Sequence, residues 1–135
     1  VNKYALKAFI RAKEDPRIIL VSDATAGSCS KPGKYTLGKV ILERQEEDIV
    51  YIPGTKNLAG SASTLAQGIL NVMDWYNSPL EKAIRWTSEH PRAIIGLSKT
   101  PEVDDMAEWI KWEKINDHWE IKSVRLGNFE MNSKV

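Results

Sequence analysis

The sequence reads Arg17-Ile18-Ile19-Leu20-Val21-Ser22-Asp23 over its longest apolar run, and this run ends in a carboxylate. Unbroken apolar runs of this kind are typical of strands in a parallel sheet whose two faces are both covered by helices. Upstream, residues 2–13 carry apolar side chains at helical spacing among basic ones, which predicts an amphipathic helix. A helix that ends at Asp15-Pro16 and leads into a buried strand predicts an α/β unit.

Downstream of Asp23 the sequence predicts a loop and then a β-hairpin. Residues 24–33 are rich in Gly, Ser and Thr, which is a loop composition. The segments 35–42 and 48–52 flank the polar residues 43–47, so they predict a hairpin with a charged tip.

Three helices are predicted next. Residues 65–76 place apolar side chains along one helical face. The second helix starts at Ser78-Pro79-Leu80-Glu81, which reads as a capping box, with Ser78 accepting an N-terminal amide, Pro79 in the first helical position and Glu81 reaching back. A short third helix is expected over residues 90–97.

In the C-terminal region the helical spacing of apolar residues gives way to segments typical of strands. Residues 108–115 and 119–126 are rich in Trp, Ile and Val and are separated by Asn116-Asp117, which predicts a terminal β-hairpin. A helix over residues 102–112 is the alternative.

Composition and charge limit the function classes. A chain of 135 residues is one domain or a piece of a larger one. Its 19 basic and 18 acidic residues are interspersed, which argues against nucleic acid and favours a small-molecule partner.

No apolar run approaches the roughly 18 residues needed to cross a membrane, so we expect no membrane role. The single Cys29 is typical of a cytoplasmic protein, and the start at Val1 means either processing or a missing upstream portion.

Two positions are candidates for a site. Asp23 follows a predicted buried strand, where parallel α/β folds assemble their sites, although an Asp there is also a good turn residue. The stretch from Leu58 to Thr64 runs into a helix, so its amides and hydroxyls could bind an anion or a hydroxyl group. Gly60 would permit close backbone approach to a ligand. The alternative is that Ser61 or Ser63 simply caps the helix.

The remaining candidates favour structural roles. His90 and His118 each lack a second ligand at metal-binding spacing. Cys29 has no evident His partner, so it is interpreted as an ordinary thiol. The tryptophans 109, 112 and 119 could stack a sugar or a base, but such clusters more often form the core of a small sheet.

Three motifs, taken together, resemble one enzyme family. They are Leu20-Val21-Ser22-Asp23-Ala24-Thr25-Ala26, Asn57-Leu58-Ala59-Gly60-Ser61 and His90-Pro91-Arg92-Ala93-Ile94-Ile95-Gly96. Their order and spacing resemble N-acetylglucosamine-6-phosphate deacetylase, of the amidohydrolase superfamily. The resemblance covers roughly residues 1–97.

The resemblance implies an α/β fold in which residues 1–97 form the C-terminal part of a metal-dependent hydrolase (β/α)8 barrel. That part would comprise the last strand, a hairpin insertion and the closing helices. Residues 98–135 would then supply a terminal β-hairpin of the family's small β-sandwich domain, although the segment 101–109 departs from the family's usual glycine-spaced return to that domain.

The resemblance also implies roles for individual residues. Asp23 matches the family's aspartate that shuttles a proton between the attacking water and the leaving amine, and a carboxylate can serve as base and then as acid. Leu58, Ala59 and Gly60 match the loop that lies against the amino-sugar phosphate. The divalent metal, zinc or similar, would be held by ligands outside this chain, with Asp23 near it. We therefore expect this chain alone to be inactive, and to need the missing N-terminal portion or a homo-oligomer.

Two other hypotheses stay open at this point. One is a different amidohydrolase, such as a deaminase or a dihydroorotase-like hydrolase, that shares only the Asp at the strand end. The other is a non-catalytic remnant that acts through association, because an isolated slice of a barrel leaves a strand edge and apolar faces uncovered.

Overall fold

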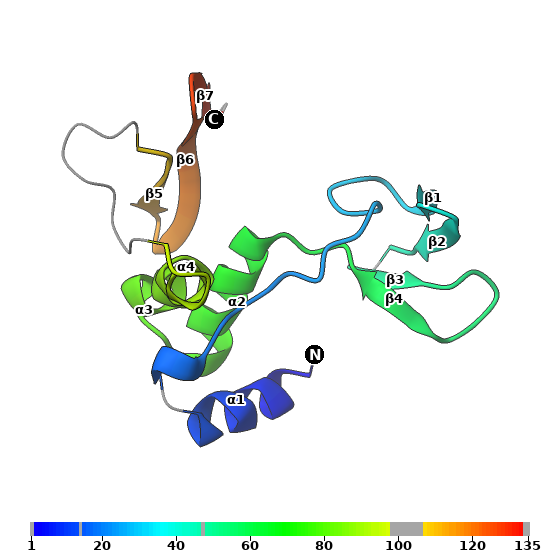
Figure 1. The fold of residues 1–135 in the computed structure, drawn as a ribbon, viewed down its shortest axis with the longest axis horizontal. Helices are drawn as coiled ribbons and strands as arrows, with labels where there is room; N and C mark the ends of the chain where they lie inside the picture. The colour runs from blue at the N-terminus through cyan, green and yellow to red at the C-terminus, as the bar shows by residue number, and fades with distance from the viewer. Residues whose placement is uncertain (1, 14, 47, 98–106, 134–135) are drawn as a thin grey trace. The chain divides into compact units, whose positions relative to one another are not determined.

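The chain divides into two compact units, Val1–Ile95 and Gly96–Val135, whose elements are labelled in Figure 1. The structure is a computed structural model, and it describes residues 2–13, 15–46, 48–97 and 107–133. No described helix is long and apolar enough to cross a membrane.

The first unit combines helices with an antiparallel sheet. The helices are α1 (Lys3–Ala12), α2 (Leu65–Tyr76), α3 (Leu80–Thr87) and α4 (Glu89–Ile94), and a short 3₁₀ helix spans Asp15–Arg17. The sheet has the order β1-β2-β3-β4, formed by Gly33–Leu37, Val40–Arg44, Ile49–Tyr51 and Leu58–Ser61. Its core cluster consists of the buried side chains Leu42, Val50 and Ala62.

The helices predicted at residues 2–13 and 65–76 are confirmed, and both begin at side-chain caps. The Asn2 side chain accepts from the Tyr4 amide at 2.9 Å before α1. The Thr64 hydroxyl accepts from the Gln67 amide at 3.1 Å before α2, so neither Ser61 nor Ser63 is the cap residue. Such caps satisfy amides that the first helical turn leaves without partners.

The helices after α2 are also found, but the capping box at Ser78 is wrong. The cap residue of α3 is Pro79 in an extended conformation, and no side chain caps the helix. Because α3 starts at Leu80, Ser78 lies one residue too early to reach an N-terminal amide. Its buried hydroxyl has no hydrogen-bond partner among the described residues.

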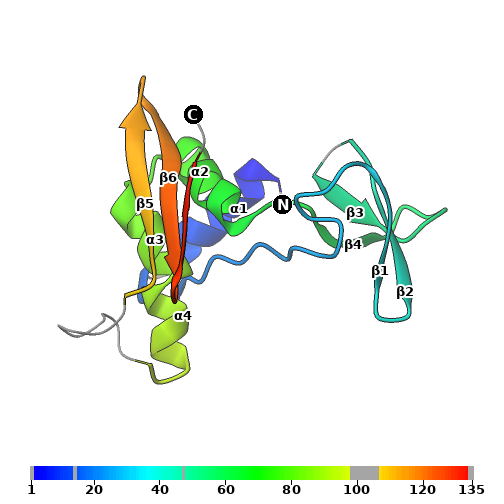
Figure 2. The ribbon, with the colours of Figure 1, turned by 90° about the horizontal axis from the view of Figure 1, so that it is seen from above.

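The predicted strand at residues 17–23 is not formed. Arg17 belongs to the 3₁₀ helix, and residues 18–22 run as a segment without regular secondary structure between the helices and the sheet (Figure 2). One isolated parallel bridge follows, between Ala24 and Ser61. A strand requires a neighbour with which to exchange backbone hydrogen bonds. Among the described residues no strand pairs with residues 18–22, and Val21 is 72% exposed.

The predicted hairpin is present with a different division of strands. Residues 35–42 do not form one strand, because Gly38, at φ 60°, and Lys39 turn the chain between β1 and β2. β2 then pairs with β3 across the charged turn, where Arg44 Nη2 lies 3.0 Å from Asp48 Oδ1. β4 is an additional strand that the sequence did not predict.

The helices of the first unit pack around Trp86. This side chain is fully buried, and its ring centroid lies 6.3 Å from that of Tyr76. Its Nε1 donates to Asp15 Oδ1 at 2.6 Å, which ties α3 to the segment after α1. Lys82 and Arg85 also face the Asp15 carboxylate, each with a nitrogen 3.6 Å from one of its oxygens.

This network makes stability depend on the charge of Asp15. Burial acts to raise the pKa of Asp15, but the Trp86 hydrogen bond and the charges of Lys82, Arg85 and His90 outweigh it and hold the pKa below its usual value. Because the pKa is lower in the folded state, the stabilisation is present above the unfolded pKa of about 3.9 and is lost as pH falls through the folded pKa. We therefore expect Asp15→Asn to reduce the acid-induced loss of unfolding free energy, measured by urea denaturation between neutral pH and about pH 3. An identical pH dependence in the variant would contradict this assignment.

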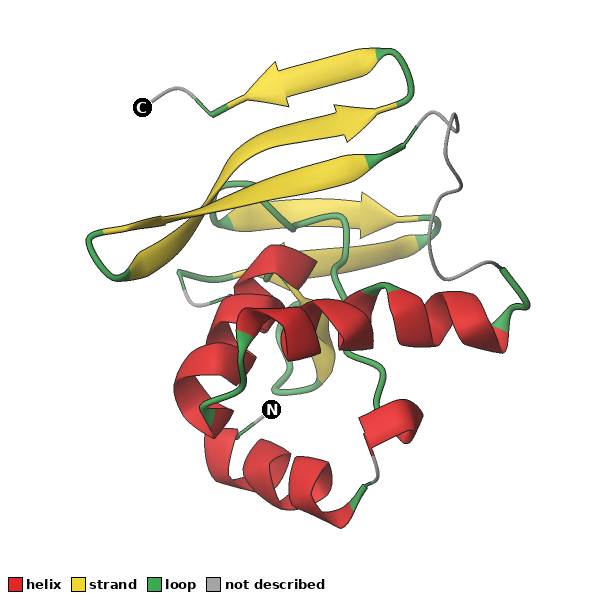
Figure 3. Cartoon of the chain, turned by 90° about the vertical axis from the view of Figure 1, so that its left-hand side faces the viewer, coloured by secondary structure: helices red, strands yellow, loops and turns green. Residues whose placement is uncertain are grey.

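The second unit is the antiparallel sheet β5-β6-β7, formed by Trp109–Ile115, His118–Leu126 and Phe129–Asn132. Figure 3 shows the strands in yellow. The predicted terminal hairpin is confirmed, with its turn at Asn116-Asp117, whereas β7 was not predicted. The alternative helix over residues 102–112 is wrong at residues 109–112, and residues 102–106 lie outside the described part.

Two of the three tryptophans of this unit, Trp112 and Trp119, share one face of the sheet. Trp112 pairs with Ile121 and Trp119 pairs with Lys114, and residues two apart on one strand point to the same side. Trp109 pairs with Arg125 beyond the register shift between Lys111 and Trp112, where this alternation is interrupted. All three tryptophans are half-buried.

Candidate active site

Asp23 stands at the point where the segment 18–22 meets the sheet. Its backbone adopts a left-handed conformation, with φ 51°, and its side chain is exposed. Left-handed backbone is uncommon for residues other than Gly, although Asp and Asn tolerate it best. Contacts with other segments therefore have to hold Asp23 in this conformation.

The contacts that hold this turn come from the end of β4. The Ser61 amide donates to the Asp23 carbonyl at 2.8 Å, and the Thr25 amide donates to the Ser61 carbonyl at 3.0 Å. These two hydrogen bonds form the parallel bridge that brackets Asp23 and Ala24. Two motifs 38 positions apart in the sequence, at Asp23 and at Ser61, are thus brought side by side.

Gly60 lies directly against the Asp23 turn. Its φ of 120° is a conformation that side-chain-bearing residues rarely adopt. A Cβ at this position would lie 2.5 Å from Thr25 Cγ2, 3.0 Å from the Asp23 carbonyl oxygen and 3.5 Å from Asp23 Oδ2. The structure therefore requires glycine here in order to pack the Asp23 turn.

The other two candidate loop residues belong to β4 rather than to a loop. Leu58 is 69% exposed, whereas Ala59 packs against the Leu42 core cluster. The structure thus brings Gly60 to Asp23, while Leu58 and Ala59 extend away along the same strand.

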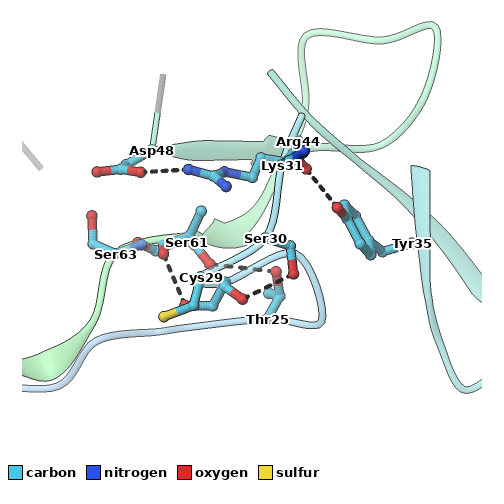
Figure 4. Close-up of polar contacts among 11 residues, drawn as sticks. Thr25, Cys29, Ser30, Lys31, Tyr35, Arg44, Asp48, Ser61 and Ser63 are labelled. Atoms are coloured by element: carbon cyan, nitrogen blue, oxygen red, sulfur yellow. Dashed lines mark hydrogen bonds and ion pairs between the residues drawn. The ribbon is translucent and has the colours of Figure 1, made fainter. Parts of the chain in front are cut away.

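Hydroxyl groups fasten the loop after Asp23 to the strand end. Figure 4 shows Thr25, Ser30, Ser61 and Ser63 around this junction. Ser28 Oγ donates to the Ala62 carbonyl at 2.8 Å, and Ser61 Oγ accepts from the Ser63 amide at 2.9 Å. The sequence did not single out Thr25, although it stands only two positions after Asp23. The one indication was the pairing of a β-branched Thr near Asp23 with the small Gly60 in the second motif.

In the first unit, the described contacts of His90 and Cys29 are with residues other than Asp23. His90 Nδ1 lies 2.7 Å from the Ile18 carbonyl oxygen, which fits a structural histidine, and His118 belongs to the second unit. Cys29 is exposed, with its sulfur 3.9 Å from Ser28 Oγ. Within the described ranges, no group of three or more His, Cys, Asp or Glu side chains is placed to hold a metal ion. The described residues by themselves therefore do not form a metal site.

The proteins that this chain resembles are hydrolytic deacetylases. More particularly, they are N-acetylglucosamine-6-phosphate deacetylases. The enzyme from Rattus norvegicus is 34% identical over 99 residues, which are 73% of this chain and 24% of that protein. The enzyme from Vibrio furnissii is 32% identical over 81 residues, which are 60% of this chain and 20% of that protein. No family model matches the sequence.

Solved structures of the same enzyme share the fold. The deacetylase from Pasteurella multocida superimposes with a TM-score of 0.80 at 18% identity, covering 98% of this chain and 34% of that chain. A mutant from Mycobacterium smegmatis, solved in complex with N-acetyl-D-glucosamine-6-phosphate, also gives a TM-score of 0.80, at 20% identity, and covers 96% of this chain and 34% of that chain.

The resemblance predicted from the three motifs is thereby confirmed. The chain is similar to the C-terminal part of N-acetylglucosamine-6-phosphate deacetylases, and it spans 20–24% of the length of the curated relatives.

Proposed function

We propose that the chain is the C-terminal part of a metal-dependent amidohydrolase that converts N-acetylglucosamine-6-phosphate to glucosamine-6-phosphate and acetate. The observation that carries the proposal is the junction of Asp23 with Gly60. Two motifs that resemble the family's proton-shuttling aspartate and its substrate loop meet through the Ser61 amide, 2.8 Å from the Asp23 carbonyl oxygen. The sequence similarity to the curated deacetylases supports the same assignment.

The chemistry needs one group that first removes and then supplies a proton. Asp23 as a carboxylate takes a proton from the attacking water as the new C–O bond to the acetyl carbon forms. The same group then gives this proton to the amine nitrogen as the C–N bond breaks, so it ends ionised as it began. The Asp23 carboxylate is exposed next to the end of β4, so a substrate bound beside residues 58–60 would be able to reach it.

A divalent metal ion would polarise the amide carbonyl and acidify the water in enzymes of this type. The described residues do not supply a ligand set, so the protein ligands would have to come from other parts of the polypeptide or from a partner. Asp23 would lie near such an ion.

Residues 18–22 also call for a partner outside the described residues. We infer that residues 18–23 pair as the last strand of a (β/α)8 barrel with polypeptide outside the described residues. The absence of a described strand partner for residues 18–22 and the exposed Ile19 and Val21 side chains support this assignment. Residues 98–135 would supply strands of the small β-sandwich domain.

A substrate panel tests the proposed reaction. The protein expressed from its complete reading frame and loaded with zinc is assayed on N-acetylglucosamine-6-phosphate, N-acetylglucosamine, dihydroorotate and adenosine. We expect the highest kcat/KM for the phosphorylated acetamido sugar, because kcat/KM reports differential binding of the transition state. A preference for dihydroorotate or adenosine would instead show another amidohydrolase that shares only the Asp.

A further inference from the structure

We propose that Thr25 is a positioning residue that fixes the Asp23 carboxylate against β4. The inference rests on the proposed function, because it assigns Thr25 a role in the reaction that Asp23 carries out. In this proposal Thr25 does not react with the substrate. It acts by fixing the backbone of Asp23.

Thr25 is bound to the end of β4 by two hydrogen bonds. Its amide donates to the Ser61 carbonyl at 3.0 Å, and its Oγ1 donates to the same oxygen at 3.3 Å. The Ser61 amide in turn donates to the Asp23 carbonyl. Thr25 and Asp23 are therefore both tied to one residue of β4, and Thr25 makes two of the three hydrogen bonds.

The methyl group of Thr25 also packs against Gly60 of β4. Thr25 Cγ2 fills the space beside Gly60, only 2.5 Å from where a Cβ of residue 60 would stand. The methyl group and the missing Cβ are complementary, so the turn can approach β4 closely enough to form both backbone bonds. The hydroxyl and the methyl group of Thr25 thus serve separate contacts, which two different substitutions can remove one at a time.

These contacts oppose the backbone strain at Asp23. Asp23 is held at φ 51°, which is unfavourable for a residue with a side chain. If the turn were released from β4, Asp23 could relax to a common backbone conformation, and its carboxylate would move. A displacement of about 1 Å in a reacting group can lower turnover by about 100-fold.

The experiment compares Thr25→Ala, Thr25→Val and Thr25→Ser in the complete protein. Valine keeps the methyl group and loses the hydroxyl bond, whereas serine keeps the hydroxyl and loses the methyl group. We expect Thr25→Ala to lower kcat for the acetamido sugar phosphate by about 10–100-fold with KM changed less than about twofold. Valine and serine should each restore part of kcat. Thr87→Ala is the matched control, because Thr87 makes the same kind of hydroxyl bond, 3.0 Å to the Ile84 carbonyl within α3, and should keep the parent kcat.

Hydrogen exchange of the Ser61 amide separates positioning from simple loss of stability. It should accelerate in Thr25→Ala, while exchange of core amides such as that of Val50 stays at the parent rate. Parent kcat in Thr25→Ala, or unchanged Ser61 exchange, overturns the inference and leaves the proposed function standing. A parent protein without turnover on the acetamido sugar phosphate overturns the proposed function, and the role of Thr25 with it.

Discussion

Asp23→Asn is expected to lower kcat of the complete protein on N-acetylglucosamine-6-phosphate by about 10²–10⁴-fold, the range that a general acid–base group contributes. Asparagine has nearly the same shape and leaves the backbone contacts with Ser61 in place, but its amide can neither accept nor return the proton. Steady-state kinetics measure the effect, and KM should change little because the lost interaction is made in the transition state.

Asp74→Asn provides the matched control for this substitution. Asp74 is an exposed carboxylate on α2 and takes no part in the Asp23 turn, so its loss should leave kcat at the parent value. Near-parent turnover of Asp23→Asn at saturating substrate would remove Asp23 from the mechanism.

The second large effect is expected from Trp86→Ala, which should reduce the free energy of unfolding by about 3–5 kcal/mol. Trp86 is fully buried, and its removal leaves a cavity between the helices of the first unit. It also removes the Nε1 donor from Asp15, although Lys82 and Arg85 still face that carboxylate. Chemical denaturation measures the loss.

Trp86→Phe separates packing from hydrogen bonding at this position. Phenylalanine keeps an aromatic ring in the core but has no N–H donor for Asp15. Its cost should be clearly smaller than that of alanine, since one hydrogen bond to a charged group contributes about 1.5–3 kcal/mol. Equal stability of Trp86→Ala and the parent protein would show that Trp86 does not organise the helices.

Periodicity predicted the helices at residues 2–13 and 65–76, because an apolar stripe along one helical face can be recognised from local sequence alone. The two following helices were predicted from Pro and Gly at their boundaries. The capping-box prediction at Ser78 was wrong, because α3 starts at Leu80, one residue later than the motif requires. Strand pairing depends on distant partners. The run 17–23 has the composition of a buried strand, yet no described segment is available to pair with residues 18–22. The turn at Gly38 and the short β4 were missed for the related reason that register is set by neighbouring strands.

The candidate site was predicted in part. The motifs named Asp23 and Gly60 separately, and the structure brings them into contact. The sequence predicted that Gly60 leaves room for a ligand to approach its backbone. In the structure the space beside the Gly60 Cα is filled by the methyl group of Thr25. This pairing could not be read from the sequence, because the two residues are 35 positions apart and meet only through the bridge between Ala24 and Ser61.

The decisive measurement is the release of acetate and free amine from N-acetylglucosamine-6-phosphate by the complete zinc-loaded protein. We expect both products to appear in equal amounts and Asp23→Asn to suppress both together. No acetate release from the complete protein, or release that is unaffected by Asp23→Asn, would contradict this expectation.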